Sequence, residues 1–128
     1  MEPIFSFTKE ERICSKKELD FLFSEGLSFT AYPLRIIYVE RETVSDIPVS
    51  ILISVPKKRF KRAVKRNRIK RLVRESYRLN KPDLISFLSE KEKSIQIAFL
   101  YVSDKLLDYK EVEQSIIKSF NILKERLS

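Results

Sequence analysis

The period at which hydrophobic residues recur changes along the chain, and each period predicts a type of secondary structure. Segment 15–26 has three hydrophobic residues at the i, i+3, i+4 spacing of a helix, namely Leu19, Leu22 and Phe23. Ser15 and Glu18 have the spacing of a capping box, and Gly26, the only glycine of the chain, suits a left-handed residue after a helix end. We therefore predict an amphipathic helix over residues 15–26.

Two segments have the composition or alternation of strands, residues 33–42 and residues 48–56. The second segment places four β-branched residues on one face: Val49, Ile51, Ile53 and Val55. Pro56 ends this strand, because proline has no N–H to continue a ladder. The short polar turn between the two segments predicts that they pair as an antiparallel hairpin.

Residues 61–78, KRAVKRNRIKRLVRESYR, combine helical periodicity with a high density of positive charge. Five residues at the spacing i, i+3, i+4, i+7, i+8 form a stripe for burial: Ile69, Leu72, Val73, Ser76 and Tyr77. The residue before a proline avoids helical backbone, so we predict that this helix ends at residues 80–82, which include Pro82. Residues 83–93 are a candidate for a further short helix.

Residues 94–103 are almost continuously apolar, which is typical of a strand covered on both faces and predicts a central position. Asp108 and Glu111 again have a helix-capping spacing. They precede the stripe of a last amphipathic helix: Val112, Ile116, Phe120, Leu123 and Leu127. The order of elements predicts an α+β fold with a small mixed sheet. We expect a single domain over residues 1–128, in which roughly the first 10 residues form a loose N-terminal segment.

Charge is distributed unevenly along the chain. The formal net charge is +8, and 13 of the 26 lysines and arginines lie in residues 57–81 beside a single acid, Glu75. The rest of the chain is net acidic, so one intensely basic segment favours a polyanionic partner. The single cysteine cannot form an internal disulfide, and no apolar run approaches the ~20 residues of a membrane helix. With an N-terminus unlike a signal peptide, these features predict a cytoplasmic protein without a membrane partner.

Residue types that many active sites require are missing from the chain. It has no histidine and one cysteine, which excludes a zinc site of the usual Cys/His kind and Ser/His/Asp or Cys/His catalysis. One glycine is too few for a glycine-rich phosphate loop. The acids in residues 40–42 and 89–93 lie among lysines and arginines and have the pattern of solvated surface charge. We expect neither catalytic residues nor a metal site in the polypeptide.

The outward face of the helix in residues 61–78 is basic and almost uncompensated. Its polar positions are Arg66, Asn67, Arg68, Lys70, Arg71, Arg74 and Arg78. Like charges one turn apart destabilise a helix by a few tenths of a kcal/mol per pair, and Glu75 is the only acid that could relieve them. An external polyanion would supply the missing negative charge.

A solvated surface, a localisation signal and a membrane contact each account less well for this face than nucleic acid does. A solvated surface needs less charge and mixed signs, and localisation signals usually lie in irregular segments. A membrane surface would compete with the core for the apolar stripe. Nucleic acid is therefore favoured, and RNA fits better than DNA because neither a helix-turn-helix partner nor a zipper accompanies the helix.

The order of residues in segment 63–75, AVKRNRIKRLVRE, resembles the protein subunit of bacterial ribonuclease P. That family has an Arg-Asn-Arg core followed by a hydrophobic residue, Lys, Arg, Leu and a further Arg. The matching residues here are Arg66, Asn67, Arg68, Ile69, Lys70, Arg71, Leu72 and Arg74. With FLFSEG in the first helix and ISVPKK before the basic helix, the resemblance covers roughly residues 12–126. It implies an α+β fold like domain 2 of ribosomal protein S5, with an unusual left-handed βαβ crossover.

The resemblance also implies a function, in which the protein assists a catalytic RNA that removes the 5′ leader from precursor tRNA. The RNA subunit performs the hydrolysis with Mg²⁺, and the polypeptide has no metal site. The implied partners are ribonuclease P RNA and precursor tRNA, and no DNA is expected. The residues implied to bind RNA are Lys57, Lys58, Arg66, Asn67, Arg68, Lys70, Arg71 and Arg74, and those of the leader cleft are Leu19 and Phe23. The alternative is a general RNA-binding or ribosome-associated protein without an enzymatic partner.

Three features depart from the family pattern. Leu19 stands where the family usually has phenylalanine, with Phe21 nearby. The loop in residues 57–62 has no glycine and is one residue longer, with Phe60 inserted. The register of residues 33–39 leaves open which of three residues faces the cleft: Arg35, Ile37 or Tyr38.

Overall fold

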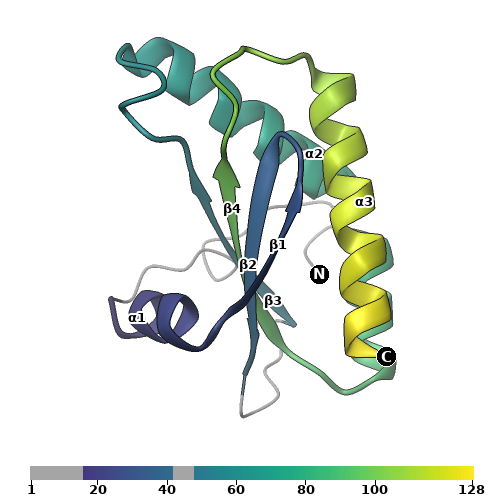
Figure 1. The fold of residues 1–128 in the computed structure, drawn as a ribbon. Helices are drawn as coiled ribbons and strands as arrows, with labels where there is room; N and C mark the ends of the chain where they lie inside the picture. The colour runs from purple at the N-terminus through teal and green to yellow at the C-terminus, as the bar shows by residue number, and fades with distance from the viewer. Residues whose placement is uncertain (1–15, 42–47) are drawn as a thin grey trace, which may run out of the picture.

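Three helices and a four-stranded sheet make up the described part of the chain, residues 16–41 and 48–128 of a computed structural model (Figure 1). In order, the elements are α1 (Lys16–Glu25), β1 (Leu27–Ala31), β2 (Leu34–Glu40), β3 (Val49–Ser54), α2 (Ala63–Glu90), β4 (Ile95–Tyr101) and α3 (Tyr109–Leu127). The predicted α+β class is confirmed. Sequence periodicity did not reveal β1, most of whose side chains are exposed. No helix in these residues is both long and apolar enough to cross a membrane.

β4 lies inside the sheet, as its apolar sequence predicted. The strand order is β1-β2-β4-β3, in which β4 pairs antiparallel with β2 and parallel with β3. The predicted hairpin of residues 33–42 with residues 48–56 is therefore wrong. β2 and β3 do not pair, because β4 buries side chains on both faces and takes the place between them. The hairpin of this fold is instead β1 with β2, joined at Tyr32 and Pro33.

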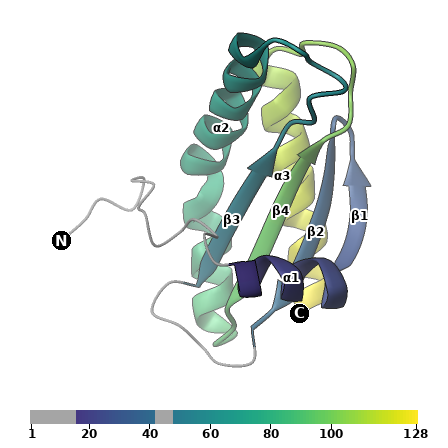
Figure 2. The same ribbon diagram turned by 90° about the vertical axis from the view of Figure 1, so that its left-hand side faces the viewer.

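The unit β3–α2–β4 has a left-handed crossover. In Figure 2 both strands point upward, β4 lies to the right of β3, and α2 returns behind the sheet. Most βαβ connections are right-handed, so this arrangement is uncommon. It agrees with the crossover that the family resemblance implied. It also places the start of α2 at the end of the sheet where β3 finishes.

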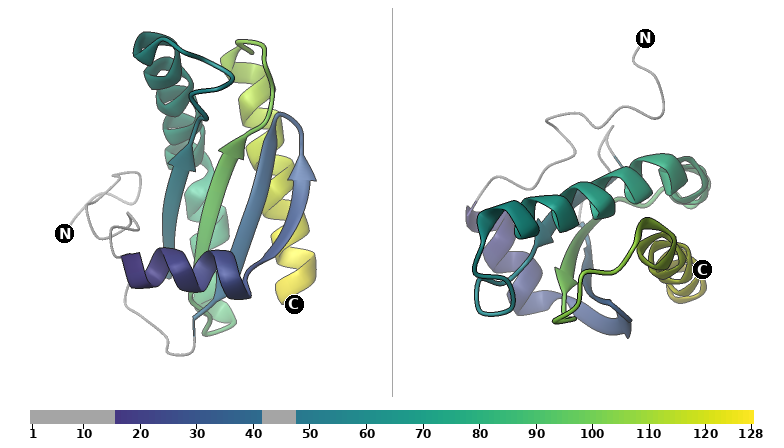
Figure 3. Two further views of the ribbon diagram at one scale, coloured as in Figure 1. Left: turned by 60° about the vertical axis from the view of Figure 1, so that its left-hand side comes forward. Right: turned by 90° about the horizontal axis from the view of Figure 1, so that it is seen from above.

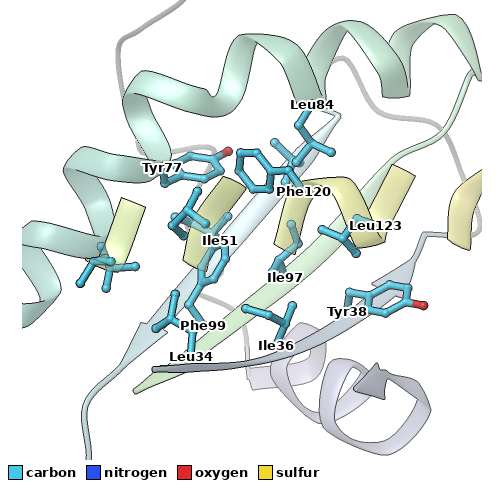
Figure 4. Close-up of a cluster of buried hydrophobic side chains, with 14 of the residues drawn as sticks. Leu34, Ile36, Tyr38, Ile51, Tyr77, Leu84, Ile97, Phe99, Phe120 and Leu123 are labelled. Carbon is cyan, nitrogen blue, oxygen red and sulfur yellow. The ribbon is translucent and has the colours of Figure 1, made fainter. Parts of the chain in front are cut away.

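The main core lies between the sheet and the two helices α2 and α3. Figure 3 shows α3 and most of α2 on one side of the sheet and α1 on the other. Ile97 of β4 lies opposite Tyr38 of β2 and Ile51 of β3, and all three side chains belong to this core. The Tyr77 ring of α2 packs edge-on against Phe120 of α3, with centroids 6.2 Å apart (Figure 4). The predicted stripes of both helices therefore meet in one cluster.

The start of α3 agrees with its prediction. The Asp108 side chain accepts a hydrogen bond from the Glu111 backbone N–H at 2.9 Å, which satisfies one of the free donors of the first turn. The five residues of the predicted stripe are all buried: Val112, Ile116, Phe120, Leu123 and Leu127.

α2 continues through Pro82 to Glu90, so the predicted stop before that proline is wrong. The candidate short helix of residues 83–93 is the second half of the same helix. A proline inside a helix costs about 3 kcal/mol, because it removes a hydrogen bond and crowds the preceding turn. Leu84 and Leu88 lie beyond it and are fully buried in the core, where each burial contributes about 1.5–3 kcal/mol. Tertiary packing thus offsets the local penalty.

Gly26 ends α1 for a reason other than the predicted left-handed conformation, since its φ is not positive. Its N–H donates to the Leu22 carbonyl oxygen at 2.9 Å. A Cβ at this position would lie 2.3 Å from the same oxygen and 2.8 Å from Ile37 Cγ2. The glycine is required by the close approach of α1 to β2. Ser15 of the predicted capping box and the expected N-terminal segment lie outside the described residues.

Candidate nucleic-acid interface

The Arg-Asn-Arg motif occupies the first turns of α2, and most of its polar side chains lie on the outside of the helix. Ile69 and Val73 hold these turns to the core. Four motif residues are exposed: Asn67, Arg68, Arg71 and Arg74. Arg66 and Lys70 are half-buried. Lys57 and Lys58 are exposed in the turn between β3 and α2, so the predicted RNA-binding residues lie along one half of α2 and the segment that precedes it (Figure 2).

This surface carries no negative charge of its own. Among residues 16–41 and 48–128, seven side chains of this surface form neither an ion pair nor a hydrogen bond: Lys57, Lys58, Asn67, Arg68, Lys70, Arg71 and Arg74. We call these seven residues the basic face. Glu75 lies beside them, but a hydrogen bond from Arg78 lowers the pKa of its carboxyl group and holds it in an ion pair at 2.6 Å. The cations of the basic face therefore remain available to an anionic partner.

Arg66 differs from the other motif residues because the protein itself binds its guanidinium group. Its Nη1 donates to the carbonyl oxygen of Phe60 at 2.7 Å and to that of Lys61 at 2.8 Å. Both carbonyls belong to the segment that enters α2. The helix begins after Arg62 without a side-chain cap and without an acid in its first turn. Arg66 thus bridges the first turns of α2 to the chain before it.

Phe60, the residue inserted relative to the family pattern, anchors the loop between β3 and α2. Its side chain is 6% exposed, and its ring lies 5.9 Å from that of Tyr101, centroid to centroid. Arg59 next to it forms an ion pair with Asp104 at 2.8 Å, which ties the loop to the segment after β4. Sequence patterns leave Phe60 without a role. The one available signal is a large aromatic ring within a basic run, which burial favours.

A second surface lies on the other face of the sheet, beside α1. Leu22 of α1 packs against Val39 and Ala98, and Leu19 and Phe21 cover the edge of this small cluster. Phe23 belongs to neither hydrophobic cluster and is 50% exposed. Of the two predicted cleft residues, Leu19 is therefore packed on the sheet and Phe23 is accessible.

The register of β2 decides which of its side chains face α1. Ile37 packs in the cluster beneath α1, and Arg35, two residues earlier, points to the same face and is exposed. Tyr38 points to the opposite face and belongs to the main core. Figure 2 shows that α1 crosses only one end of the strands, so it leaves the other end of this face uncovered. Arg35 lies on that face between Thr30 and Leu100 in the neighbouring strands.

The described residues contain no group of three or more His, Cys, Asp and Glu side chains that could hold a metal ion. Comparison with known proteins identifies the family. The profile of the family described as Ribonuclease P matches residues 7–124.

The chain belongs to the ribonuclease P protein family.

The ribonuclease P protein component of Porphyromonas gingivalis strain W83 is 48% identical over 117 residues, which span 91% of this chain and 85% of that relative. The component from Dictyoglomus thermophilum is 39% identical over 117 residues, across 90% of this chain and 89% of the relative. Among solved structures, the Staphylococcus aureus ribonuclease P protein has a TM-score of 0.71 at 22% identity, and covers 89% of this chain and 95% of its own. The Thermotoga maritima ribonuclease P protein has a TM-score of 0.66 at 24% identity, with coverage of 90% and 96%. These two structures support the predicted ribosomal protein S5 domain 2-like fold.

Family membership confirms the function implied by the motif. The chain is a protein subunit of ribonuclease P, the endoribonuclease that matures the 5′ end of tRNA. It thereby decides against the alternative of an RNA-binding protein without an enzymatic partner. The signal for this conclusion was the order of residues 63–75 together with the segments FLFSEG and ISVPKK, because that order is specific to the family, whereas positive charge alone is not.

Proposed function

We propose that the protein binds the RNA subunit of ribonuclease P through the basic face, and that this RNA supplies the hydrolytic chemistry. The observation that carries the proposal is a set of exposed cations on α2 and the preceding turn with no countercharge among the described residues. Arginine forks suit phosphate oxygens, and an RNA backbone would relieve the repulsion between successive turns. Asn67 lies among them, and its amide has no hydrogen-bond partner among the described residues, so it can bind a phosphate, a sugar or a base edge.

We further propose that the 5′ leader of precursor tRNA lies on the uncovered part of the sheet beside α1. Phe23 offers an accessible ring on this side of the molecule, and Arg35 offers a cation that forms no ion pair with the other described residues. An aromatic ring next to positive charge suits single-stranded RNA of any sequence, because every base has a face that stacks. Leu19, which packs on the sheet, would support the site without stacking.

Mg²⁺ is assigned to the RNA subunit in this proposal. Acidic side chains of the described chain do not gather into a site for a divalent ion, whereas the phosphates of a folded RNA offer oxygen ligands that Mg²⁺ prefers. The polypeptide contributes binding and orientation of the substrate. A lone cysteine and an RNA partner both suit the cytoplasm, which we propose as its compartment.

The salt dependence of binding tests the first proposal. The dissociation constant of the protein for ribonuclease P RNA is measured over a range of salt concentrations for the wild type, Arg71→Ala and Arg74→Ala. Each substitution is expected to weaken binding roughly tenfold and to flatten the salt slope by about 0.7–0.9, the contribution of one phosphate contact. Lys118→Ala, which removes an exposed cation from α3, serves as the control and should change neither. Unchanged slopes for both arginine variants would place them outside the RNA interface.

Cleavage of precursor tRNA tests the second proposal. The protein alone should not cleave the substrate, whereas protein and RNA together should cleave it at low Mg²⁺. Phe23→Ala is expected to cost about 1–3 kcal/mol of binding to a leader-bearing substrate and to leave binding of mature tRNA unchanged. Arg35→Ala should also weaken binding of the leader-bearing substrate relative to mature tRNA, and this loss should depend on salt concentration. Equal losses for leader-bearing and mature tRNA would contradict a leader site beside α1.

A further inference from the structure

We propose that Arg66, the first arginine of the motif, is a positioning residue that sets how α2 presents the basic face. It acts by holding the carbonyl groups of the loop before the helix. The inference rests on the proposed binding of RNA by the basic face. It separates Arg66 from residues such as Arg71, whose charges would act on RNA directly.

The contacts of Arg66 lie within the protein. Nη1 donates to the carbonyl oxygens of Phe60 and Lys61, at 2.7 and 2.8 Å. Hydrogen bonds from a charged donor are about twice as strong as neutral ones, so two of them on one nitrogen strongly favour this conformation. Arg68, by contrast, is exposed and without a partner among the described residues. The two arginines that flank Asn67 therefore have different tasks.

The loop held by Arg66 is fixed at two further points. The Phe60 ring packs on Tyr101 with a centroid distance of 5.9 Å, and the Arg59 guanidinium pairs with Asp104 at 2.8 Å. Tyr101 in turn donates to the Lys105 carbonyl oxygen at 2.5 Å. The path from the β4–α3 segment to the start of α2 is thus a continuous series of contacts.

This series fixes the start of α2, which has no side-chain cap. Helices usually begin at a Ser, Thr, Asp or Asn whose side chain binds the first N–H groups, and α2 begins at Arg62 with no such bond. An acid in the first turn would stabilise the helix, but it would also repel RNA phosphates from the helix end. Arg66 instead holds the carbonyl oxygens of the two residues, Phe60 and Lys61, that lead into α2, and it adds no negative charge. The first turn of α2 therefore has no acidic residue and still has a defined direction.

Amide hydrogen exchange and RNA binding together test this role. The N–H groups of Arg59 and Phe60 donate to the Pro56 carbonyl oxygen, at 3.2 and 3.3 Å, and report on the loop in the free protein. Arg66→Ala is expected to speed their exchange at least tenfold and to weaken binding of ribonuclease P RNA roughly tenfold. The salt slope should stay that of the wild type. Arg66→Lys, which replaces the guanidinium with an ammonium donor, should recover part of both the protection and the affinity.

Arg71→Ala is the matched control, with a flatter salt slope and unchanged exchange of the loop. A double variant with Phe60→Leu adds a second criterion. If Arg66 acts through the loop, the combined loss of affinity will be smaller than the product of the two single losses. Unchanged loop exchange in Arg66→Ala, together with a slope flattened by one phosphate contact, would overturn the positioning role. If the wild type failed to bind the RNA, the proposed function would fail instead, while the exchange measurement would still test the hold on the loop.

Discussion

Arg78 binds the carboxylate of Glu75 through two hydrogen bonds, from Nη2 at 2.6 Å and from Nε at 3.2 Å. The two residues are three apart on α2, so the pair lies on the helix surface directly after Arg74. It neutralises Arg78 where the basic face ends. The pair therefore marks a boundary between the half of α2 proposed to bind RNA and the half that packs on α3.

Glu75→Gln is expected to extend the basic face past this boundary. The substitution removes the one acid of residues 57–81 and the ion pair that it forms with Arg78. Binding of ribonuclease P RNA should tighten several-fold, and the salt slope should steepen by up to about 0.7–0.9 if Arg78 gains a phosphate contact. Glu111→Gln on α3, also exposed, is the control and should leave the binding isotherm unchanged. An unaltered affinity in Glu75→Gln would place the interface nearer to the start of α2.

Gly26→Ala is expected to destabilise the fold. The added Cβ would lie 2.3 Å from the Leu22 carbonyl oxygen and 2.8 Å from Ile37 Cγ2, so α1 and β2 would have to separate. Overpacking of this kind lowers the free energy of unfolding by about 1–3 kcal/mol, which urea denaturation followed by circular dichroism can measure. Ser28→Ala, on the exposed side of the neighbouring strand, is a control with little expected effect. A neutral Gly26→Ala would mean that α1 docks loosely on the sheet.

Pro82→Ala is expected to stabilise the protein. Alanine restores an N–H that can donate within α2 and removes the clash of the ring with the preceding turn. The gain is reduced because alanine also makes the unfolded chain more flexible, so we expect a net increase of about 1–3 kcal/mol in the free energy of unfolding. Hydrogen exchange should show the new amide of residue 82 to be protected. A loss of stability with a rapidly exchanging amide would contradict a continuous helix through Glu90.

Tyr109 gives the stability of the protein a component that depends on alkaline pH. Burial, and the hydrogen bond that its hydroxyl donates to Glu113 Oε2 at 2.9 Å, raise the pKa of Tyr109 to about 12. In the unfolded chain the phenol ionises near its usual pKa of about 10, so the unfolded state loses its proton first. The free energy of unfolding should therefore fall between pH 10 and about 12.

Tyr109→Phe removes this component. Urea denaturation at a series of pH values above 9 should show a shallower decline in the variant than in the wild type, because phenylalanine has no proton to lose. All other titratable groups are common to both proteins, so their contributions cancel in the comparison. Identical declines would show that the hydroxyl is as free in the folded chain as in the unfolded one.

Sequence periodicity predicted the helices and strands whose residues repeat regularly, and it failed where a distant contact decides the outcome. The apolar run of residues 94–103 indicated a central strand, and Asp108 indicated the start of α3. Sequence periodicity could not show that β2 pairs with β4 and not with β3. Pairing depends on how all the strands pack in the sheet, and no single segment contains that information. The length of α2 was missed for a similar reason: the local rule at Pro82 is outweighed by Leu84 and Leu88, whose partners lie on other elements.

By itself, the sequence determined the chemistry of this protein. A motif centred on Asn67 indicates an RNA-binding subunit of ribonuclease P, because residue type and order are local properties. Tertiary structure decided which contacts individual residues of that motif make. Arg66 and Arg68 are equivalent in the sequence, yet the loop folded by Phe60 brings two carbonyl oxygens to Arg66 and none to Arg68. A hydrogen bond requires a partner at a defined distance, and only the folded chain sets that distance.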